Sequence, residues 1–186
     1  MAQKNTICID FDDVVVKISG VILENLGLFF NEVYDINSII KYNISDCLKI
    51  DTDIVQDAVD IALENTDLEL EKDADEVIKW LNTFYNIHIV TLRRPEYLQY
   101  IDLILKNNNM LQYISGIYCT EDKLKVINEL NAVAFIEDNP EYITQGFETT
   151  LIFDKPWNRN ISNSGYIQRV HNWQEIKDYF MIKLGA

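Results

Sequence analysis

The sequence predicts an α/β protein, in which a mostly parallel sheet has helices on both faces and an all-helical segment follows the first strand. From residue 73 onward, short apolar runs that end in polar residues alternate with helical patterns, which is typical of βα units. Residues 17–70 carry only helical spacing. A chain of 186 residues is long enough for one such core with an inserted lobe.

The first strand is predicted from Thr6, in an apolar run that ends abruptly in carboxylates. Residues two apart on an extended chain share a side, so Asp10 and Asp12 can reach one site just beyond the strand. Carboxylates gathered in this way repel each other unless a cation lies between them. Taken alone, such a pair is also compatible with a solvated turn.

The inserted segment is expected to contain a helix over residues 17–34, a short broken helical piece over 35–47 and a helix from 53 to about 65. Asp53 is expected to cap the last of these, because Gln56 lies three residues later. The segment holds 11 acidic and 3 basic residues, which most simply form a solvated face.

Helices and strands then alternate to the end of the chain. Because crossovers between parallel strands are right-handed, all the strands end at the same edge of the sheet. The predicted helices are 75–84, 97–105, 123–130 and 172–184, and the predicted strands are 87–90, 116–119, 133–136, 149–153 and 167–170.

Four groups of polar residues come together at that edge. Carboxylates and a backbone carbonyl suit Mg²⁺, which prefers oxygen ligands, whereas a hydroxyl, a lysine and an arginine suit a phosphate. Each group also has a simpler interpretation as a helix cap, a surface lysine or an ordinary turn. The groups are Asp10 with Asp12, Thr91 with Arg93 and Arg94, Lys123 with Lys125, and Glu137 with Asp138.

This ordered set resembles the haloacid dehalogenase (HAD) superfamily of phosphohydrolases. The resemblance covers the whole chain: residues 1–16 and 71–186 correspond to the Rossmann-like core, and residues 17–70 to the small helical cap inserted in it. An acidic pair alone is a weak signal, but the ordered set is specific. The residues that carry the resemblance are Asp10-Phe11-Asp12, Thr91, Lys123 and Glu137-Asp138.

A narrower resemblance is to the 5′(3′)-deoxyribonucleotidase branch. It is carried by residues 135–141, by the Pro-Trp-Asn loop within residues 153–159 and by the tail at residues 169–176. Two positions depart from the usual pattern. Asp13 stands where many members have a small residue, and Glu137 stands where many have a second aspartate.

The resemblance implies a role for each residue of the set. Asp10 would attack phosphorus and form an aspartyl-phosphate, while Asp12 would act as general acid and then as general base. Thr91 and Lys123 would hold the phosphate oxygens, with Lys125 as an alternative to Lys123. Mg²⁺ would be held by Asp10, the Asp12 backbone carbonyl and Asp138, with Glu137 in a second shell.

Substrate-binding residues are expected around the same edge. Cations there would draw in an acidic substrate, although each arginine could equally pair with a surface carboxylate. Aromatic residues of the cap are candidate walls for a base, although such residues more often belong to a core. The predicted set is Leu92, Arg93, Arg94, Lys155, Arg159 and Tyr42, with Phe29 and Phe30 as further wall candidates.

The resemblance implies a Mg²⁺-dependent phosphomonoester hydrolase, most specifically a 5′(3′)-deoxyribonucleotidase or 5′-nucleotidase acting on nucleoside monophosphates. A HAD phosphatase of a sugar phosphate or another small metabolite is the main alternative, and a non-catalytic phospho-ligand-binding relative is another. A signalling receiver domain fits poorly, because residues 118–120 end the third strand of the sequence without an aspartate.

Composition restricts the partners and the compartment. With 30 acidic and 16 basic residues, the formal net charge is −14, which argues against binding to polymeric nucleic acid. No apolar run is long enough to span a bilayer, no signal peptide is visible, and the three cysteines have no metal-type spacing. We therefore expect a cytoplasmic protein without a membrane partner, and a homodimer is compatible with the sequence.

Overall fold

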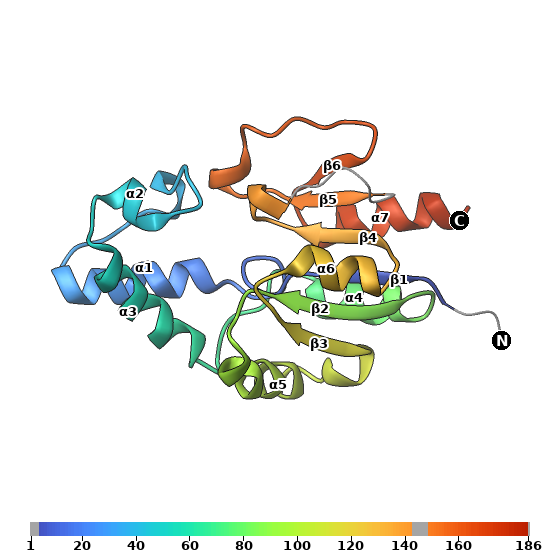
Figure 1. Ribbon diagram of the computed structural model, residues 1–186, viewed down its shortest axis with the longest axis horizontal. Helices are drawn as coiled ribbons and strands as arrows, with labels where there is room; N and C mark the ends of the chain where they lie inside the picture. The colour runs from blue at the N-terminus through green and yellow to red at the C-terminus, as the bar shows by residue number, and fades with distance from the viewer. Residues whose placement is uncertain (1–3, 143–148, 186) are drawn as a thin grey trace.

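The computed structural model describes residues 4–142 and 149–185. Its centre is a six-stranded sheet in the order β3-β2-β1-β4-β5-β6, and every neighbouring pair is parallel (Figure 1). The predicted α/β fold with a parallel sheet is confirmed. The strands are β1 (Thr6–Ile9), β2 (Asn86–Thr91), β3 (Gly116–Cys119), β4 (Ala132–Glu137), β5 (Thr150–Phe153) and β6 (Ile167–Val170).

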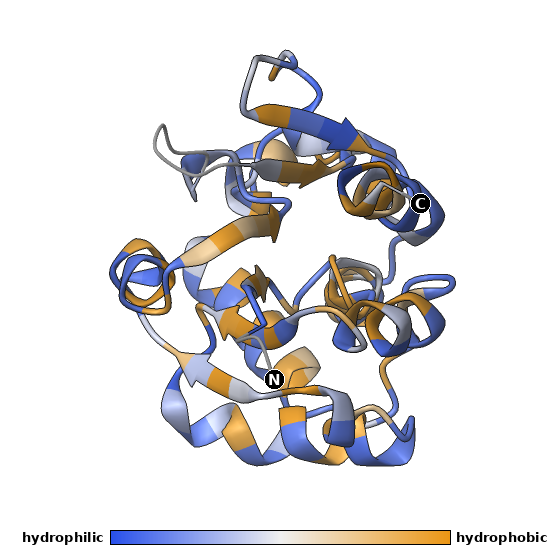
Figure 2. Cartoon of the chain, turned by 90° about the vertical axis from the view of Figure 1, so that its right-hand side faces the viewer, coloured by the Kyte–Doolittle hydropathy of each residue, from blue (hydrophilic) through white to orange (hydrophobic). Residues whose placement is uncertain are grey.

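Helices cover both faces of the sheet. Figures 1 and 2 show α4 and α7 packed together on one face and α6 on the other. The α-helices are α1 (Ile18–Phe30), α2 (Ile44–Leu48), α3 (Thr52–Leu63), α4 (Ala74–Asn82), α5 (Leu98–Asn107), α6 (Lys123–Glu129) and α7 (Trp173–Leu184). Short 3-10 turns occupy η1 (Ile36–Ser38), η2 (Pro95–Tyr97), η3 (Leu111–Tyr113), η4 (Pro140–Tyr142) and η5 (Pro156–Asn158).

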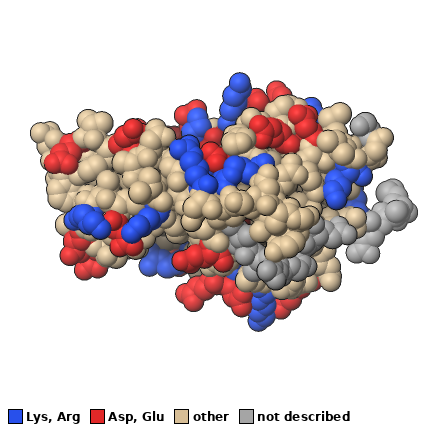
Figure 3. Space-filling model, turned by 90° about the horizontal axis from the view of Figure 1, so that it is seen from above, with Lys and Arg blue, Asp and Glu red and all other residues tan. Residues whose placement is uncertain are grey.

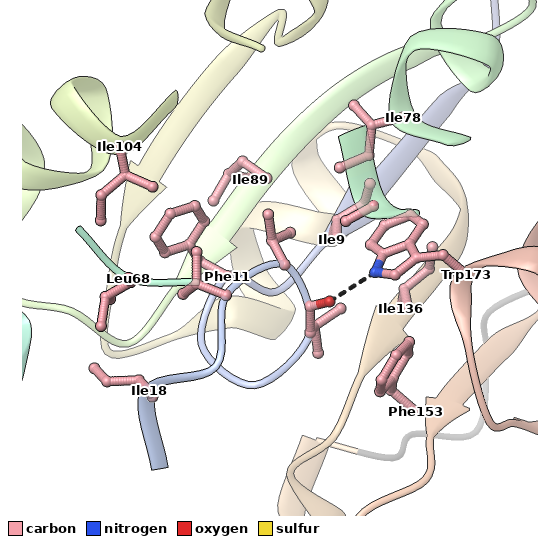
Figure 4. Close-up of a cluster of buried hydrophobic side chains, with 14 of the residues drawn as sticks. Ile9, Phe11, Ile18, Leu68, Ile78, Ile89, Ile104, Ile136, Phe153 and Trp173 are labelled. Carbon is pink, nitrogen blue, oxygen red and sulfur yellow. Dashed lines mark hydrogen bonds between the residues drawn. The ribbon is translucent and has the colours of Figure 1, made fainter. Parts of the chain in front are cut away.

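The hydrophobic core lies between the sheet and the helices that cover it. Strand β1 is in the middle of the sheet, so Ile7, Cys8 and Ile9 are all fully buried, and the strand reads as a continuous apolar run. Trp173, at the start of α7, belongs to the same buried cluster as Ile7 and Ile9, and its indole Nε1 donates a hydrogen bond of 2.8 Å to the carbonyl oxygen of Val14 (Figure 4). The loop after β1 is therefore anchored to the last helix.

The helices α1, α2 and α3 form a separate group at one end of the molecule, and the strand arrows in Figure 1 point toward it. The chain enters and leaves this group through two adjacent segments. Lys17 N donates to Glu69 O over 2.9 Å, and Glu71 N donates to Val15 O over 2.8 Å. These bonds lie at the predicted limits of the cap, residues 17–70. We use the word cap for this group below.

The helix limits in the cap differ from the sequence prediction at two places. Helix α3 begins at Thr52, because the Asp51 side chain accepts a hydrogen bond of 2.9 Å from Asp53 N, so the predicted cap at Asp53 is wrong. Helix α1 ends at Phe30 instead of Tyr34, because Asn31 adopts a left-handed conformation with a φ of 53°. Asparagine tolerates that conformation better than most residues and commonly ends a helix.

No helix among residues 4–142 and 149–185 is long and apolar enough to cross a membrane.

Substitution of Trp173 tests its anchoring role. Trp173→Phe keeps an aromatic ring but leaves the buried Val14 carbonyl without its donor, which costs about 1–3 kcal/mol in free energy of unfolding. For a chain of this size that lowers the Tm by about 2–12 °C in a thermal scan. Trp80→Phe is the matched control, because Trp80 is partly exposed and should tolerate the change better. Equal Tm values for Trp173→Phe and wild type would contradict this role.

Candidate active site

Lys123 is at the centre of a buried cluster of charges at the C-terminal edge of the sheet. Its Nζ lies 2.8 Å from Asp10 Oδ1 and 2.8 Å from Glu137 Oε2, and all three residues are buried. The parallel register brings these residues together, because β1 and β4 are neighbours, Asp10 directly follows β1 and Glu137 is the last residue of β4. Lys123 is the first residue of α6, a helix capped by the Asp122 side chain, which accepts from Lys125 N.

Glu137 and Asp138 are held by many hydrogen bonds. Glu137 Oε1 accepts from the backbone nitrogens of Asp138 and Asn139, at 3.0 and 2.9 Å. Asp138 Oδ2 accepts from Trp157 Nε1 at 2.9 Å, and its backbone carbonyl accepts from Asn158 Nδ2 at 2.8 Å. The Pro-Trp-Asn loop, identified in the sequence only as part of a resemblance, thus orients an acidic residue of the cluster.

The titration of the cluster is shifted by burial and by mutual repulsion. Burial, followed by the charge of Glu137, raises the pKa of Asp10 to about 8. Burial, with Glu137 and Asp10, also raises the pKa of Asp138 well above its usual value. For Lys123 burial acts to lower the pKa, but the two carboxylates beside it outweigh burial and raise the pKa overall. The cluster therefore favours the binding of a further cation, which would reduce the repulsion between its carboxylates.

A magnesium ion fits this set of residues. One oxygen from each of Asp10, Glu137 and Asp138 lies within 4.8 Å of the others, and all three residues are buried. Carboxylate oxygens are the ligands that Mg²⁺ prefers, and Lys123 offsets only one of the three negative charges. The roles of the Asp12 carbonyl as a ligand and of Glu137 in a second shell stay predictions.

The Asp12 side chain pairs with Arg93. Arg93 Nη2 lies 2.7 Å from Asp12 Oδ1, and the Arg93 side chain is only 1% exposed, against 24% for Asp12. Thr91 is also buried, and its Oγ1 accepts from Arg93 N at 3.2 Å, which leaves its own hydrogen to donate. Arg93, expected from the sequence to contact substrate, contacts the Asp12 carboxylate in this structure, and its role toward substrate stays a prediction.

The other cations predicted to bind substrate also have carboxylate partners. Lys155 Nζ lies 2.5 Å from Glu71 Oε1, Arg94 pairs with Asp60 and Glu96, and Arg159 Nε lies 3.4 Å from Asp154 Oδ2. Figure 3, which views the molecule from above, shows basic side chains next to acidic ones on the face seen there. Arg94 and Arg159 fit the surface-pair alternative, and Lys125 and Leu92 are exposed.

A cavity of about 480 Å³ lies between the cap and the acidic edge of the sheet. The Asp12 and Asp138 side chains reach it from the core, and Tyr42 from the cap lies in an edge-on contact with Trp157, at 6.5 Å between ring centroids. The rest of the wall combines apolar and polar residues, and its apolar part comes mainly from α1 and α3. The predicted wall residues Phe29 and Phe30 do not line it. The lining includes Ile18, Ile22, Ile39, Ile44, Val55, Val59 and Leu63.

Asp13 is a buried residue of the site to which sequence reasoning gave no role. Its φ of 56° is left-handed, and its carboxylate accepts from Ser19 N at 3.1 Å and from Ser19 Oγ. Burial raises its pKa to about 6. Asp13 thereby ties the loop after β1 to the first turn of α1. The sequence feature that could have pointed to Asp13 was an aspartate at a position where many HAD members have a small residue.

Comparison with solved structures identifies the fold. The HAD-hydrolase YfnB from Bacillus subtilis, bound to magnesium, is 14% identical and superposes with a TM-score of 0.65, over 99% of this chain and 100% of that one. A predicted phosphoglycolate phosphatase from Haemophilus somnus is 12% identical with a TM-score of 0.64, over 100% of both chains.

A haloacid dehalogenase-like protein from Streptococcus pneumoniae, SP0104, is 16% identical with a TM-score of 0.62, over 97% of this chain and 100% of that one. This chain has the HAD fold. No family model matches the sequence, and no curated protein matches it. The deoxyribonucleotidase branch expected from the sequence is not among the names of these neighbours.

The raised pKa values predict that Mg²⁺ stabilises the protein in a pH-dependent way. An unfolded aspartate has a pKa of about 3.9. The metal-free folded chain holds a proton on Asp10 up to about pH 8. The stability from this proton is complete below about pH 4 and is lost as the pH rises through 8. Mg²⁺ competes with that proton and therefore stabilises more at pH 8 than at pH 5.

Thermal scans with and without Mg²⁺ at the two pH values test this. At about 100 times Kd a ligand contributes about 2.7 kcal/mol, which is about 5–10 °C in Tm for a chain of this size. We expect that increase at pH 8 and a clearly smaller one at pH 5. Asp138→Asn should reduce the increase at pH 8. An equal increase at both pH values would show that Mg²⁺ binds elsewhere.

Lys123 and Lys125 provide a matched pair of substitutions on one helix. Lys123→Met leaves Asp10 and Glu137 without their buried cation, which costs about 3–5 kcal/mol in free energy of unfolding. The loss should be smaller at pH 5 than at pH 8, because a proton on Asp10 removes one unpaired charge. Lys125→Met, at an exposed position, should change the free energy by less than about 0.5 kcal/mol. Urea unfolding measures both, and equal losses would contradict the buried cluster.

Proposed function

We propose that this chain is a Mg²⁺-dependent phosphomonoester hydrolase that works through an aspartyl-phosphate on Asp10. The observation that carries the proposal is the buried cluster of Asp10, Lys123, Glu137 and Asp138 at the C-terminal edge of the sheet. It brings a candidate nucleophile, a fixed cation and a set of oxygen ligands within a few ångströms of one another. Such a set suits the positioning and charge stabilisation on which phosphoryl transfer depends.

Two steps follow from these residues. In the first, an Asp10 carboxylate oxygen bonds to phosphorus while the ester oxygen leaves and takes a proton from Asp12. In the second, Asp12 removes a proton from a water molecule whose oxygen bonds to phosphorus, and the bond to Asp10 breaks. The Lys123 ammonium and the Thr91 hydroxyl, both buried at this edge, would donate to the phosphate oxygens.

Asp10 must be ionised to act as the nucleophile, whereas burial and the charge of Glu137 favour its protonated form. Lys123, at 2.8 Å, favours the ionised form. Mg²⁺, when bound by Asp10 and Asp138, would add positive charge that favours the Asp10 carboxylate and the developing charge on the phosphate.

A nucleoside monophosphate is the substrate class we favour. The cavity of about 480 Å³ beside the cluster is large enough for a small ligand, and its walls combine apolar side chains with the paired rings of Tyr42 and Trp157. An aromatic base can stack on such walls, whereas a sugar phosphate alone would leave apolar surface uncovered. Among nucleotidases, the 5′(3′)-deoxyribonucleotidase reaction is our specific proposal.

A second candidate is a phosphatase of a smaller phosphorylated metabolite. Two of the structures with this fold have names that predict a phosphoglycolate phosphatase, one of them from Lactobacillus plantarum with a TM-score of 0.64 and 14% identity. Such a substrate would be held by its anionic ends, and the cap would then act mainly to exclude water.

A phosphate-release screen with Mg²⁺ separates the two candidates. Deoxy- and ribonucleoside 5′- and 3′-monophosphates, sugar phosphates and phosphoglycolate are compared by kcat/KM, with Asp10→Asn as the matched control. We expect the highest value for a deoxynucleotide, and complete loss of turnover in a folded Asp10→Asn protein. A preference for phosphoglycolate or a sugar phosphate would select the second candidate. Equal activity of Asp10→Asn and wild type would remove Asp10 from the mechanism.

A further inference from the structure

The Arg93 side chain bridges Asp12 and the cap. Its Nε lies 3.2 and 3.0 Å from the two carboxylate oxygens of Asp12, and its Nη2 lies 2.7 Å from Oδ1. Its Nη1 donates to the backbone carbonyl of Leu63, at 3.2 Å. The guanidinium carbon also lies 5.1 Å from the centre of the Phe11 ring. A planar group bound on three sides and buried has little freedom to contact substrate.

The cap end of this bridge is the last residue of α3. The carbonyls in the last turn of a helix have no partner inside it, and a cation there is favoured by the helix dipole. A second contact joins the same turn to the loop after β2, since Tyr97 OH donates to Asp60 Oδ1 at 3.0 Å and accepts from Arg94 Nη2 at 2.7 Å. The loop after β2 thus holds the end of α3 at two points.

We propose that Arg93 is a positioning residue, which orients the Asp12 carboxyl for proton transfer and couples its orientation to the cap through Leu63. The proposal rests on the phosphatase function above and goes beyond it. Asp12 can turn about two side-chain bonds, and a bidentate contact with Arg93 restricts both. When the cap moves, Leu63 moves with α3, and Arg93 transmits the change to Asp12. Proton transfer is thereby tied to cap position.

Leaving groups distinguish positioning from substrate binding. An alkoxide, such as that of a nucleotide, needs a proton from Asp12 in order to leave, whereas p-nitrophenolate leaves without one. For Arg93→Gln we expect the first-turnover rate on the best alkyl ester of the screen to fall about 100-fold, the usual cost of a misplaced catalytic group. The burst of p-nitrophenolate from p-nitrophenyl phosphate should fall less than about 5-fold, and KM should change little.

A double substitution tests whether Arg93 acts through Asp12. If it does, adding Arg93→Gln to Asp12→Asn should slow the alkyl ester reaction by less than about 3-fold further, although each single change is large. Arg93→Lys keeps the charge but lacks the planar fork, so it should lose most of the rate as well. Circular dichroism and thermal scans confirm that each variant is folded.

A matched pair of tyrosine substitutions tests the contact between the loop after β2 and the cap. Tyr97→Phe removes the hydroxyl that joins Arg94 to Asp60, and Tyr100→Phe removes a hydroxyl from the adjacent ring, 6.2 Å away. We expect Tyr97→Phe to slow the alkyl ester reaction about 3- to 10-fold without slowing the p-nitrophenolate burst, and Tyr100→Phe to match wild type. No change in Tyr97→Phe would overturn the coupling to the cap.

The remaining outcomes separate this proposal from the function on which it rests. Equal losses on both esters, with a raised KM and independent effects of the Asp12 and Arg93 changes, would make Arg93 a substrate-binding residue and overturn the positioning role alone. A wild-type protein that releases phosphate from no ester in the screen would remove the proposed function, and this proposal with it.

Discussion

The ion pairs of one buried lysine hold together the acidic edge of the sheet. Lys123, 1% exposed, lies 2.8 Å from both Asp10 and Glu137 and offsets part of the charge that β1 and β4 bring together. Buried carboxylates without a cation would be driven to protonate, and burial with the charge of Glu137 raises the pKa of Asp10 even beside Lys123. Lys123 therefore offsets only part of the cost of burying these carboxylates, and burial still favours the protonated form of Asp10.

The cap is joined to the core at several polar contacts around this edge. Lys155 pairs with Glu71 where the chain leaves the cap, Asp13 binds the first turn of α1 through Ser19, and Arg93 reaches the last turn of α3. The contacts of Asp13 and Arg93 join the loops after β1 and β2 to the ends of cap helices, and that of Lys155 joins the loop after β5 to the segment between α3 and α4. A displacement of the cap would therefore act on the residues of the site, which is the physical basis of the proposed coupling between Arg93 and the cap.

Sequence reasoning located the elements and the acidic edge because both follow from local patterns. Apolar runs ending at Asp10, Thr91 and Glu137 are strands that must lie side by side, and right-handed crossovers put their ends on one edge. The pairing of Arg93 with Asp12 could not be predicted, since it depends on how the loop after β2 turns back over the loop after β1. Side-chain pairs between loops have no periodicity to reveal them.

By itself, the sequence determined the α/β fold, the inserted helical segment and the set of groups at the strand ends, because hydrophobic periodicity and chain topology dictate them. Only the tertiary structure decided which charged side chains are paired and which residues are their partners. It assigned Lys123 and not Lys125 to the buried cluster, gave Arg94 and Arg159 surface carboxylate partners, and made Trp157 a donor to Asp138. The reason is physical: a charge selects its partner by distance and burial, and both are properties of the packed molecule alone.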